Sequence, residues 1–213
     1  MHSVLRLCLW ILAGLVLEVP AAPPTDDSWI VSAYHRSLAN EGLQKYDEAI
    51  RALEPVREAY PEGYTVNLRL GWLHYLAGHH ANAIARYRKA IAAVPGNLEA
   101  RLGLLLPLLA QKRYAEAEQV AGQVLRSDFY NYYGNLRLIL ALRGQGKHET
   151  ARKVAQRMLA LYPADVTLLQ QLALSEAALG RKTEAARLFR SIYTLDPDNP
   201  VARDHLGMTG DKR

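Results

Sequence analysis

The sequence predicts an all-α protein built as a solenoid of five helix-turn-helix repeats. Five alanines stand at a constant interval of 34 residues, without an insertion: Ala49, Ala83, Ala117, Ala151 and Ala185. Twelve residues after each alanine come Pro61, Pro95, Phe129, Pro163 and Pro197, so four of these positions hold a residue that ends helices. The segments between them are apolar at helical spacing, and no run alternates with the period of a strand. A fixed period of this length is the mark of a repeat architecture.

The repeats span residues 30–63, 64–97, 98–131, 132–165 and 166–199. Each unit has room for two antiparallel helices, which bury their apolar faces by stacking on the next unit. In the fifth unit we expect the first helix to close on Gly180, and Thr183 to cap the second. Residues 200–213 hold a short capping helix that starts at Asn199-Pro200, followed by a frayed tail. Phe129 replaces proline, so we expect an irregular joint between the third and fourth units.

The segment before the repeats has the pattern of a secretory signal. Arg6 precedes an apolar run from Leu7 to Leu17, which is too short for a bilayer span of about 20 residues, and small residues follow. We predict that residues 1–21 are a signal peptide cleaved after Ala21, that residues 22–29 are an N-terminal lead-in, and that the protein is periplasmic. An uncleaved segment anchoring the chain to the inner membrane remains the alternative. Cleavage would remove Cys8, the one cysteine, which suits an oxidising compartment.

The units resemble tetratricopeptide repeats. The second carries Leu70-Gly71, Gly78, Ala83, Tyr87, Ala90 and Pro95, and the fifth carries Leu172-Ala173, Gly180, Ala185, Phe189 and Pro197. The resemblance covers about four-fifths of the chain. It implies a right-handed α-solenoid with a short C-terminal capping helix, in which the first helices of the units line a concave surface where partner peptides lie.

Carried onto this sequence, the resemblance assigns a set of groove positions on the first helices. They are Tyr34, Leu38, Leu68, Trp72, Tyr75, Leu102, Leu106, Leu109, Leu136, Leu140, Arg143, Gln170 and Leu174. Leu68, Trp72 and Tyr75 share one helical stripe by their spacing alone, and Val66, Leu70, Leu73 and Ala77 form a second stripe on the opposite side. The first stripe either packs between neighbouring first helices or lines an open apolar groove with a polar rim of Arg69, Arg137, Arg143 and Gln171.

The sequence holds no convincing catalytic, metal or cofactor motif. The segment GQGKHE at residues 144–149 lacks the hydroxyl residue and the strand of a phosphate loop, and His74, His79 and His80 have no acidic neighbour. Glu48, Glu116, Glu149 and Glu184 fit the first turn of each second helix, where negative charge is favourable. The net charge of +5 is spread over the repeats and does not favour nucleic acid.

We therefore predict a non-enzymatic protein-binding scaffold of the bacterial cell envelope, without a cofactor. Its partner would be a protein or peptide segment, or a second copy of the chain as a homo-oligomer. The alternative is a structural, non-catalytic subunit of an envelope complex that handles or exports polysaccharide or lipid. In that case the chain would touch the membrane only through its partners.

Overall fold

The computed structural model describes residues 27–208, and these fold into helices joined by short turns with no strand among them. The helices are α1 (Ser28–Gly42), α2 (Tyr46–Ala59), α3 (Tyr64–Leu76), α4 (His80–Ala93), α5 (Leu98–Ala110), α6 (Tyr114–Ser127), α7 (Tyr132–Gly144), α8 (His148–Leu159), α9 (Val166–Ala178), α10 (Lys182–Leu195) and α11 (Pro200–His205). The predicted signal peptide, residues 1–21, lies outside the described residues.

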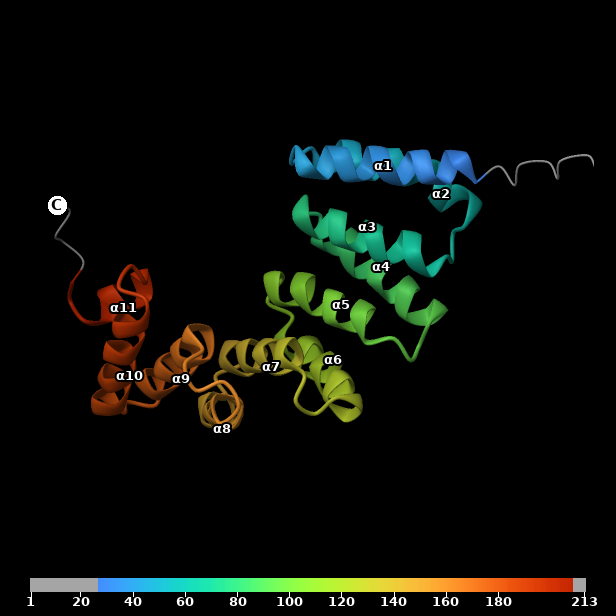
Figure 1. The fold of residues 1–213 in the computed structure, drawn as a ribbon. Helices are drawn as coiled ribbons and strands as arrows, with labels where there is room; N and C mark the ends of the chain where they lie inside the picture. Colours follow the sequence, from blue (N-terminus) through green and yellow to red (C-terminus); the bar gives the residue numbers. More distant parts are fainter. Residues whose placement is uncertain (1–26, 209–213) are drawn as a thin grey trace, which may run out of the picture.

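Consecutive helices pair and stack into a curved array, with α1 and α2 at one end and α9 to α11 at the other (Figure 1). Each helix packs on the next one in sequence, so the contacts are local to a repeat and its neighbour. This architecture confirms the α-solenoid of helix-turn-helix units that the 34-residue period predicts. The short α11 packs on α10 and covers the last repeat.

The core lies between the stacked helices and is built on the repeated alanines. Ala49, Ala83, Ala117 and Ala151 are fully buried, and Ala185 is 4% exposed. A methyl group is the largest side chain that helices crossing at close range accept without moving apart. Leucines and other aliphatic residues fill the surrounding space in clusters along the array.

The turns use a small set of devices that recur with the repeat. Gly78, Gly146 and Gly180 have positive φ, the conformation that closes a helix most easily on glycine. The first helices α5, α7 and α9 and the capping helix α11 start at side-chain caps placed 34 residues apart: Asn97, Asn131, Asp165 and Asn199. The sequence prediction of a cap at Thr183 is wrong, because α10 already begins at Lys182 and has no side-chain cap.

The loop between units is held by a side chain from the following first helix. The Asn67 amide donates to the carbonyl oxygens of Pro61 and Gly63, each at 2.9 Å. Asn135 donates in the same way to Phe129 and Asn131. The joint between the third and fourth units therefore repeats the geometry of an earlier one, although we expected Phe129 to make it irregular. The Phe129 ring instead lies outside the core, 51% exposed, beneath the Arg157 guanidinium.

Candidate functional site

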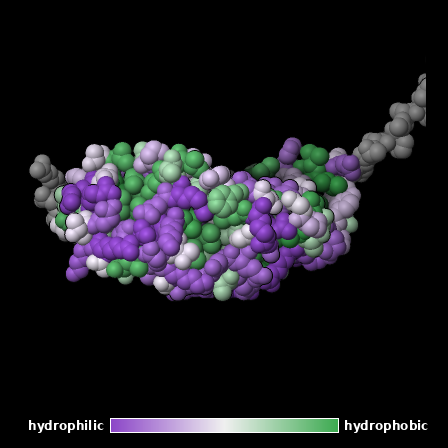
Figure 2. Space-filling view, turned by 90° about the horizontal axis from the view of Figure 1, so that it is seen from below, coloured by the Kyte–Doolittle hydropathy of each residue, from purple (hydrophilic) through white to green (hydrophobic). Residues whose placement is uncertain are grey.

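The first helices of successive repeats face one another along the inner side of the array. Helix α3 contacts α5, α5 contacts α7 and α7 contacts α9, whereas successive second helices make no comparable contact within residues 27–208. The first helices therefore lie closer together than the second helices, and they form the concave side of the array. The space-filling view shows a largely hydrophilic face with separate hydrophobic patches, and an outline hollowed along one long side (Figure 2).

The residues predicted to line the groove are partly covered and partly open. Trp72 is 36% exposed and Leu38 is 52% exposed. The rest are half-buried: Tyr34, Leu68, Tyr75, Leu102, Leu106, Leu109, Leu136, Leu140, Arg143, Gln170 and Leu174. On the opposite side of α3, Leu70 and Leu73 are fully buried. The two stripes of the first helices thus differ, since one is sealed in the core and the other keeps contact with solvent.

Four of these side chains come together in a pocket of about 260 Å³, which we call the central pocket. It is lined by Leu68, Trp72, Tyr87, Glu99, Leu102, Gly103, Leu106, Tyr133 and Arg137, from helices α3, α4, α5 and α7. Tyr34 lies apart from it, in a second apolar pocket of about 360 Å³ with Ile30 and Tyr64. The sequence did not indicate Tyr87, Glu99 or Tyr133, because their place depends on how the repeats are rotated against each other.

Tyr87 reaches the central pocket because two glycines leave space for its ring. A Cβ atom added at Gly103 would lie 2.3 Å from the Tyr87 ring, and one at Gly71 would lie 2.9 Å from it. The ring is 2% exposed, and burial raises the pKa of the Tyr87 hydroxyl above its usual range. The two glycines, one on α3 and one on α5, therefore let a residue of a second helix line the inner surface.

Arg137 provides the positive charge of the central pocket. One of its guanidinium nitrogens donates to the Leu102 carbonyl at 2.7 Å, and the group lies 5.3 Å from the centre of the Tyr133 ring. Burial lowers the pKa of Arg137, and no carboxylate of the described residues lies within ion-pair distance of it. Glu99, at the pocket edge, accepts a hydrogen bond from the Tyr64 hydroxyl at 3.3 Å.

Trp72 is held at the pocket by polar and aromatic contacts. Its indole Nε1 donates to Glu41 at 2.7 Å, and its ring centroid lies 5.8 Å from that of Tyr75. Glu41 also pairs with Arg69 and so joins α1 to α3. A tryptophan fixed in one orientation and still open to solvent can bury a large apolar surface against a partner at little entropic cost.

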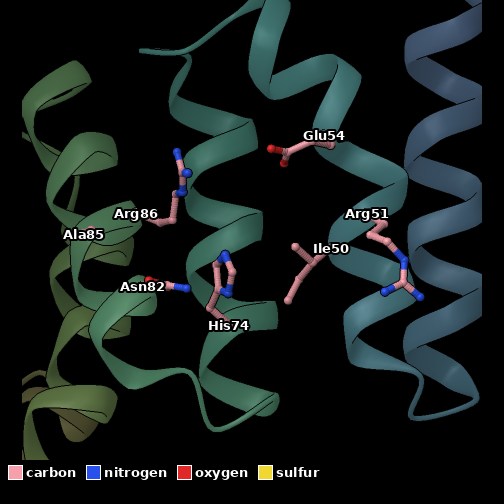
Figure 3. A pocket seen from close by; sticks show the side chains of 7 residues that line it. All are labelled: Ile50, Arg51, Glu54, His74, Asn82, Ala85 and Arg86. Atoms are coloured by element: carbon pink, nitrogen blue, oxygen red, sulfur yellow. The ribbon is translucent and has the colours of Figure 1, made fainter.

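A more polar pocket of about 450 Å³ lies between α2, α3 and α4. Figure 3 shows His74, Asn82 and Arg86 on one side of it and Ile50 and Glu54 on the other. Burial, with repulsion from Arg86 and His79, lowers the pKa of His74 from 6.5 to about 4, so the imidazole is neutral at pH 7. A hydrogen bond from Arg57 is the main cause that lowers the pKa of Glu54.

The pockets described above offer surfaces to a ligand, and the histidines and glutamates that the sequence singled out lie elsewhere in the repeats or at the edge of the polar pocket. Within residues 27–208, no cluster of three or more His, Cys, Asp or Glu residues could hold a metal ion. His74 is half-buried, and its ring lies 5.8 Å from that of the exposed His79. The four glutamates predicted at the first turns of second helices all lie there, and each pairs with an arginine three residues away. Among helices α1 to α11, none is long and apolar enough to cross a membrane.

Comparisons with known proteins agree with this arrangement. A tetratricopeptide-repeat family model matches residues 36–97 and 136–200, and a second model of the same description matches residues 74–137. Anaphase-promoting complex subunit 7 of Arabidopsis thaliana is 24% identical over 175 residues, which cover 78% of this chain and 30% of that protein. The chain thus spans less than a third of the length of this relative.

The solved structures with a similar fold include several of MamA. MamA from residue 41 to its end, from Desulfovibrio magneticus RS-1, has a TM-score of 0.74 and 19% identity, over 81% of this chain and 97% of that chain. The structure MamA MSR-1 C2 has a TM-score of 0.68 and 24% identity, over 81% of this chain and 98% of that chain. At these identities the likeness is one of fold.

A curved stack of paired helices with a half-open inner stripe defines an α-solenoid of the protein-binding kind. The family models together cover residues 36 to 200. The chain belongs to the tetratricopeptide-repeat family, whose arrays serve in general as non-catalytic scaffolds for protein–protein interaction.

Proposed function

We propose that this protein is a scaffold of the bacterial cell envelope that binds a segment of a partner protein, or of a second copy of itself, on its inner surface. The central pocket is the observation that carries the proposal. It joins apolar side chains of three successive repeats around an exposed tryptophan. Tryptophan contributes more than its share to binding energy at protein interfaces, above all at the centre of a well-packed patch.

The partner is expected to be a short segment, because the pocket is small and lies within a longer stripe. Leu109, Leu136 and Leu140 continue the half-buried surface along α5 and α7 beyond the pocket. An amphipathic helix or an extended strand could place one side chain in the pocket and its neighbours along the stripe. The same surface would serve self-association if the segment came from another copy.

A random peptide library displayed on phage tests the binding surface without a known partner. We expect the purified protein to select peptides whose affinity falls by about 2 kcal/mol or more with Trp72→Ala. Leu106→Glu should abolish binding while leaving the helical circular-dichroism signal in place, since Leu106 is open enough to solvent for a carboxylate to stay hydrated. The matched control is Leu161→Glu, which adds the same charge at a residue that is 50% exposed and outside the groove.

Two results would refute this binding surface. One is a set of selected peptides that binds Leu106→Glu as well as the unchanged protein. The other is the unfolding of the third repeat in Leu106→Glu, which would mean that the stripe is part of the core.

The envelope location is a separate part of the proposal and rests on residues 1–21. Secretion with cleavage after Ala21 would leave a mature chain that begins at Ala22 and contains no cysteine. The intact mass of the protein recovered from the envelope fraction of its source bacterium measures this directly. A mass that includes residues 1–21 would favour the anchored form, and recovery from the cytoplasm would contradict the location.

A further inference from the structure

The joints between repeats share a pair of positions 28 residues apart, one late in a first helix and one in the middle of the next. At the first joint these positions hold Glu41 and Arg69, which form an ion pair. At the fourth joint they hold Arg143 and Gln171, and the guanidinium donates to the amide oxygen. At both joints the two side chains therefore pair with each other.

The second joint holds Tyr75 and Gly103 at these positions and so has no charged residue there, whereas the third joint has a cation without a polar partner at the paired position. The two positions of the third joint hold Leu109 and Arg137, so a leucine stands where the first joint has a glutamate. Arg137 consequently keeps a carbonyl oxygen and an aromatic ring as its neighbours and has no carboxylate within 4 Å among residues 27–208. A half-buried cation without a counter-ion is unfavourable in a protein, because it loses hydration and gains no opposite charge in return.

The same cation lies in the central pocket, beside apolar side chains that remain partly open. A ligand can therefore supply the missing negative charge and cover the apolar surface in one step. Charge-assisted hydrogen bonds between guanidinium and carboxylate are among the strong ones, and Arg is suited to hold a carboxylate through two of them.

We propose that the central pocket binds its partner through one acidic side chain, which pairs with Arg137 while apolar neighbours of that residue contact Trp72 and Leu106. The proposal rests on the proposed function and adds the chemistry that the bound segment must carry. The carboxylate takes the place that Glu41 has beside Arg69.

The surroundings favour a single side-chain carboxylate within a continuous segment. Glu99 stands at the edge of the same pocket and would repel a second acidic group. The half-buried stripe continues past the pocket toward Leu109 and Leu140, so the bound chain has a surface on which to continue. A chain end would instead present its carboxylate to Arg137 with no apolar neighbour on one side.

The peptide selection described above provides the test, because peptides fused through their C-termini to the phage coat carry side-chain carboxylates and no free C-terminal carboxylate. We expect peptides selected by the unchanged protein to share one Asp or Glu between apolar residues. Selection on Arg137→Gln should lose that shared acidic position. Arg126→Gln on the outer helix α6 removes an equal charge at an exposed residue and should keep it.

One synthetic peptide from the selection then completes a double-mutant cycle. Replacing its acidic residue by Gln or Asn, or introducing Arg137→Gln, should each weaken binding about tenfold or more, and the two changes together should be no worse than either alone. The peptide should bind equally well as the free acid and as the C-terminal amide. Leu109→Glu supplies an internal carboxylate in the register of Glu41 and should weaken binding of the acidic peptide more than binding of its neutral version, because only the acidic peptide loses its pairing with Arg137.

The outcomes separate this inference from the function on which it rests. If no peptide binds in the groove, both fail. If peptides bind there without a shared acidic residue, or if their affinity ignores Arg137→Gln, the groove stands and the role of Arg137 is wrong. A requirement for the free acid would show that the pocket takes a chain end.

Discussion

Gly103→Ala tests whether the pocket depends on the close approach of Tyr87. The added Cβ atom would lie 2.3, 2.6 and 3.0 Å from three atoms of the Tyr87 ring, which is closer than carbon atoms pack. The ring has little room to retreat, because Tyr87 is 2% exposed and its ring also lies close to Gly71, where an added Cβ atom would be 2.9 Å away. Overpacking of this kind costs about 1–3 kcal/mol, and the higher helix propensity of alanine returns about 1 kcal/mol. We expect a net loss of up to about 2 kcal/mol.

Gly122→Ala is the matched control, since it makes the same change inside helix α6. A Cβ atom there would meet only the end of the Arg126 side chain, at 4.0 Å. The propensity gain should therefore appear alone and stabilise the protein by about 0.5–1 kcal/mol. Urea unfolding followed by circular dichroism compares the two variants under identical conditions.

The two variants should change the free energy of unfolding in opposite directions, and a Tyr87→Leu background tests whether the Tyr87 ring is the cause. In a Tyr87→Leu background the obstacle is gone, so Gly103→Ala should become neutral or stabilising. If Gly103→Ala stabilises the unchanged protein as much as Gly122→Ala does, the Tyr87 ring does not lie over Gly103. The placement of Tyr87 in the lining of the central pocket would then be wrong as well.

Two further predictions concern the core and the polar pocket. Ala117→Leu should lower the free energy of unfolding by about 1–3 kcal/mol, because Ala117 is fully buried where helices cross. The control Lys153→Ala changes an exposed residue and should alter that free energy by less than about 0.5 kcal/mol in the same urea experiment. His74 should make the protein less stable in mild acid: its pKa is about 4 in the folded state and near 6.5 when unfolded, so the unfolded chain takes up the proton first as pH falls from 6.5 toward 4. That difference corresponds to at most about 3 kcal/mol, which solvent screening of a half-exposed group reduces to about 1–2 kcal/mol. Melting curves between pH 7 and pH 4 should show this loss, and His74→Gln should flatten it; an unchanged slope in that variant would contradict the prediction.

The repeat architecture could be predicted from the sequence because the residues that determine it recur at a fixed interval. The buried alanines, the glycines with positive φ and the helix-ending prolines each satisfy a local requirement that recurs in every unit. The caps at Asn97, Asn131 and Asp165 carry the same 34-residue signal as Asn199, from which the start of the last helix was predicted. The interval of these caps would have located the starts of those helices.

The site was less predictable because it depends on contacts between repeats. Spacing placed Leu68 and Trp72 on one stripe, but it could not show that Tyr87 passes between Gly71 and Gly103 to reach the same pocket. Arg152 illustrates the same limit. Its place on a second helix does not reveal its partners, whereas in the structure it binds Glu149 and lies 3.9 Å from the buried Glu176 of the next repeat.

The two apolar sides of the first helices differ in their exposure to solvent. Leu70 and Leu73 are sealed in the core, so changes there would unfold the repeat, whereas Leu68 and Trp72 on the other side remain partly open. The paired positions at the joints differ from one joint to the next, whereas the alanines on which the stacking depends recur in every unit. Glu41 pairs with Arg69, and Leu109 takes the position equivalent to Glu41 at the joint of Arg137, so the same backbone carries different side chains there. In an array where each repeat contacts only its neighbours, a change at one joint acts mainly on the two repeats that meet there.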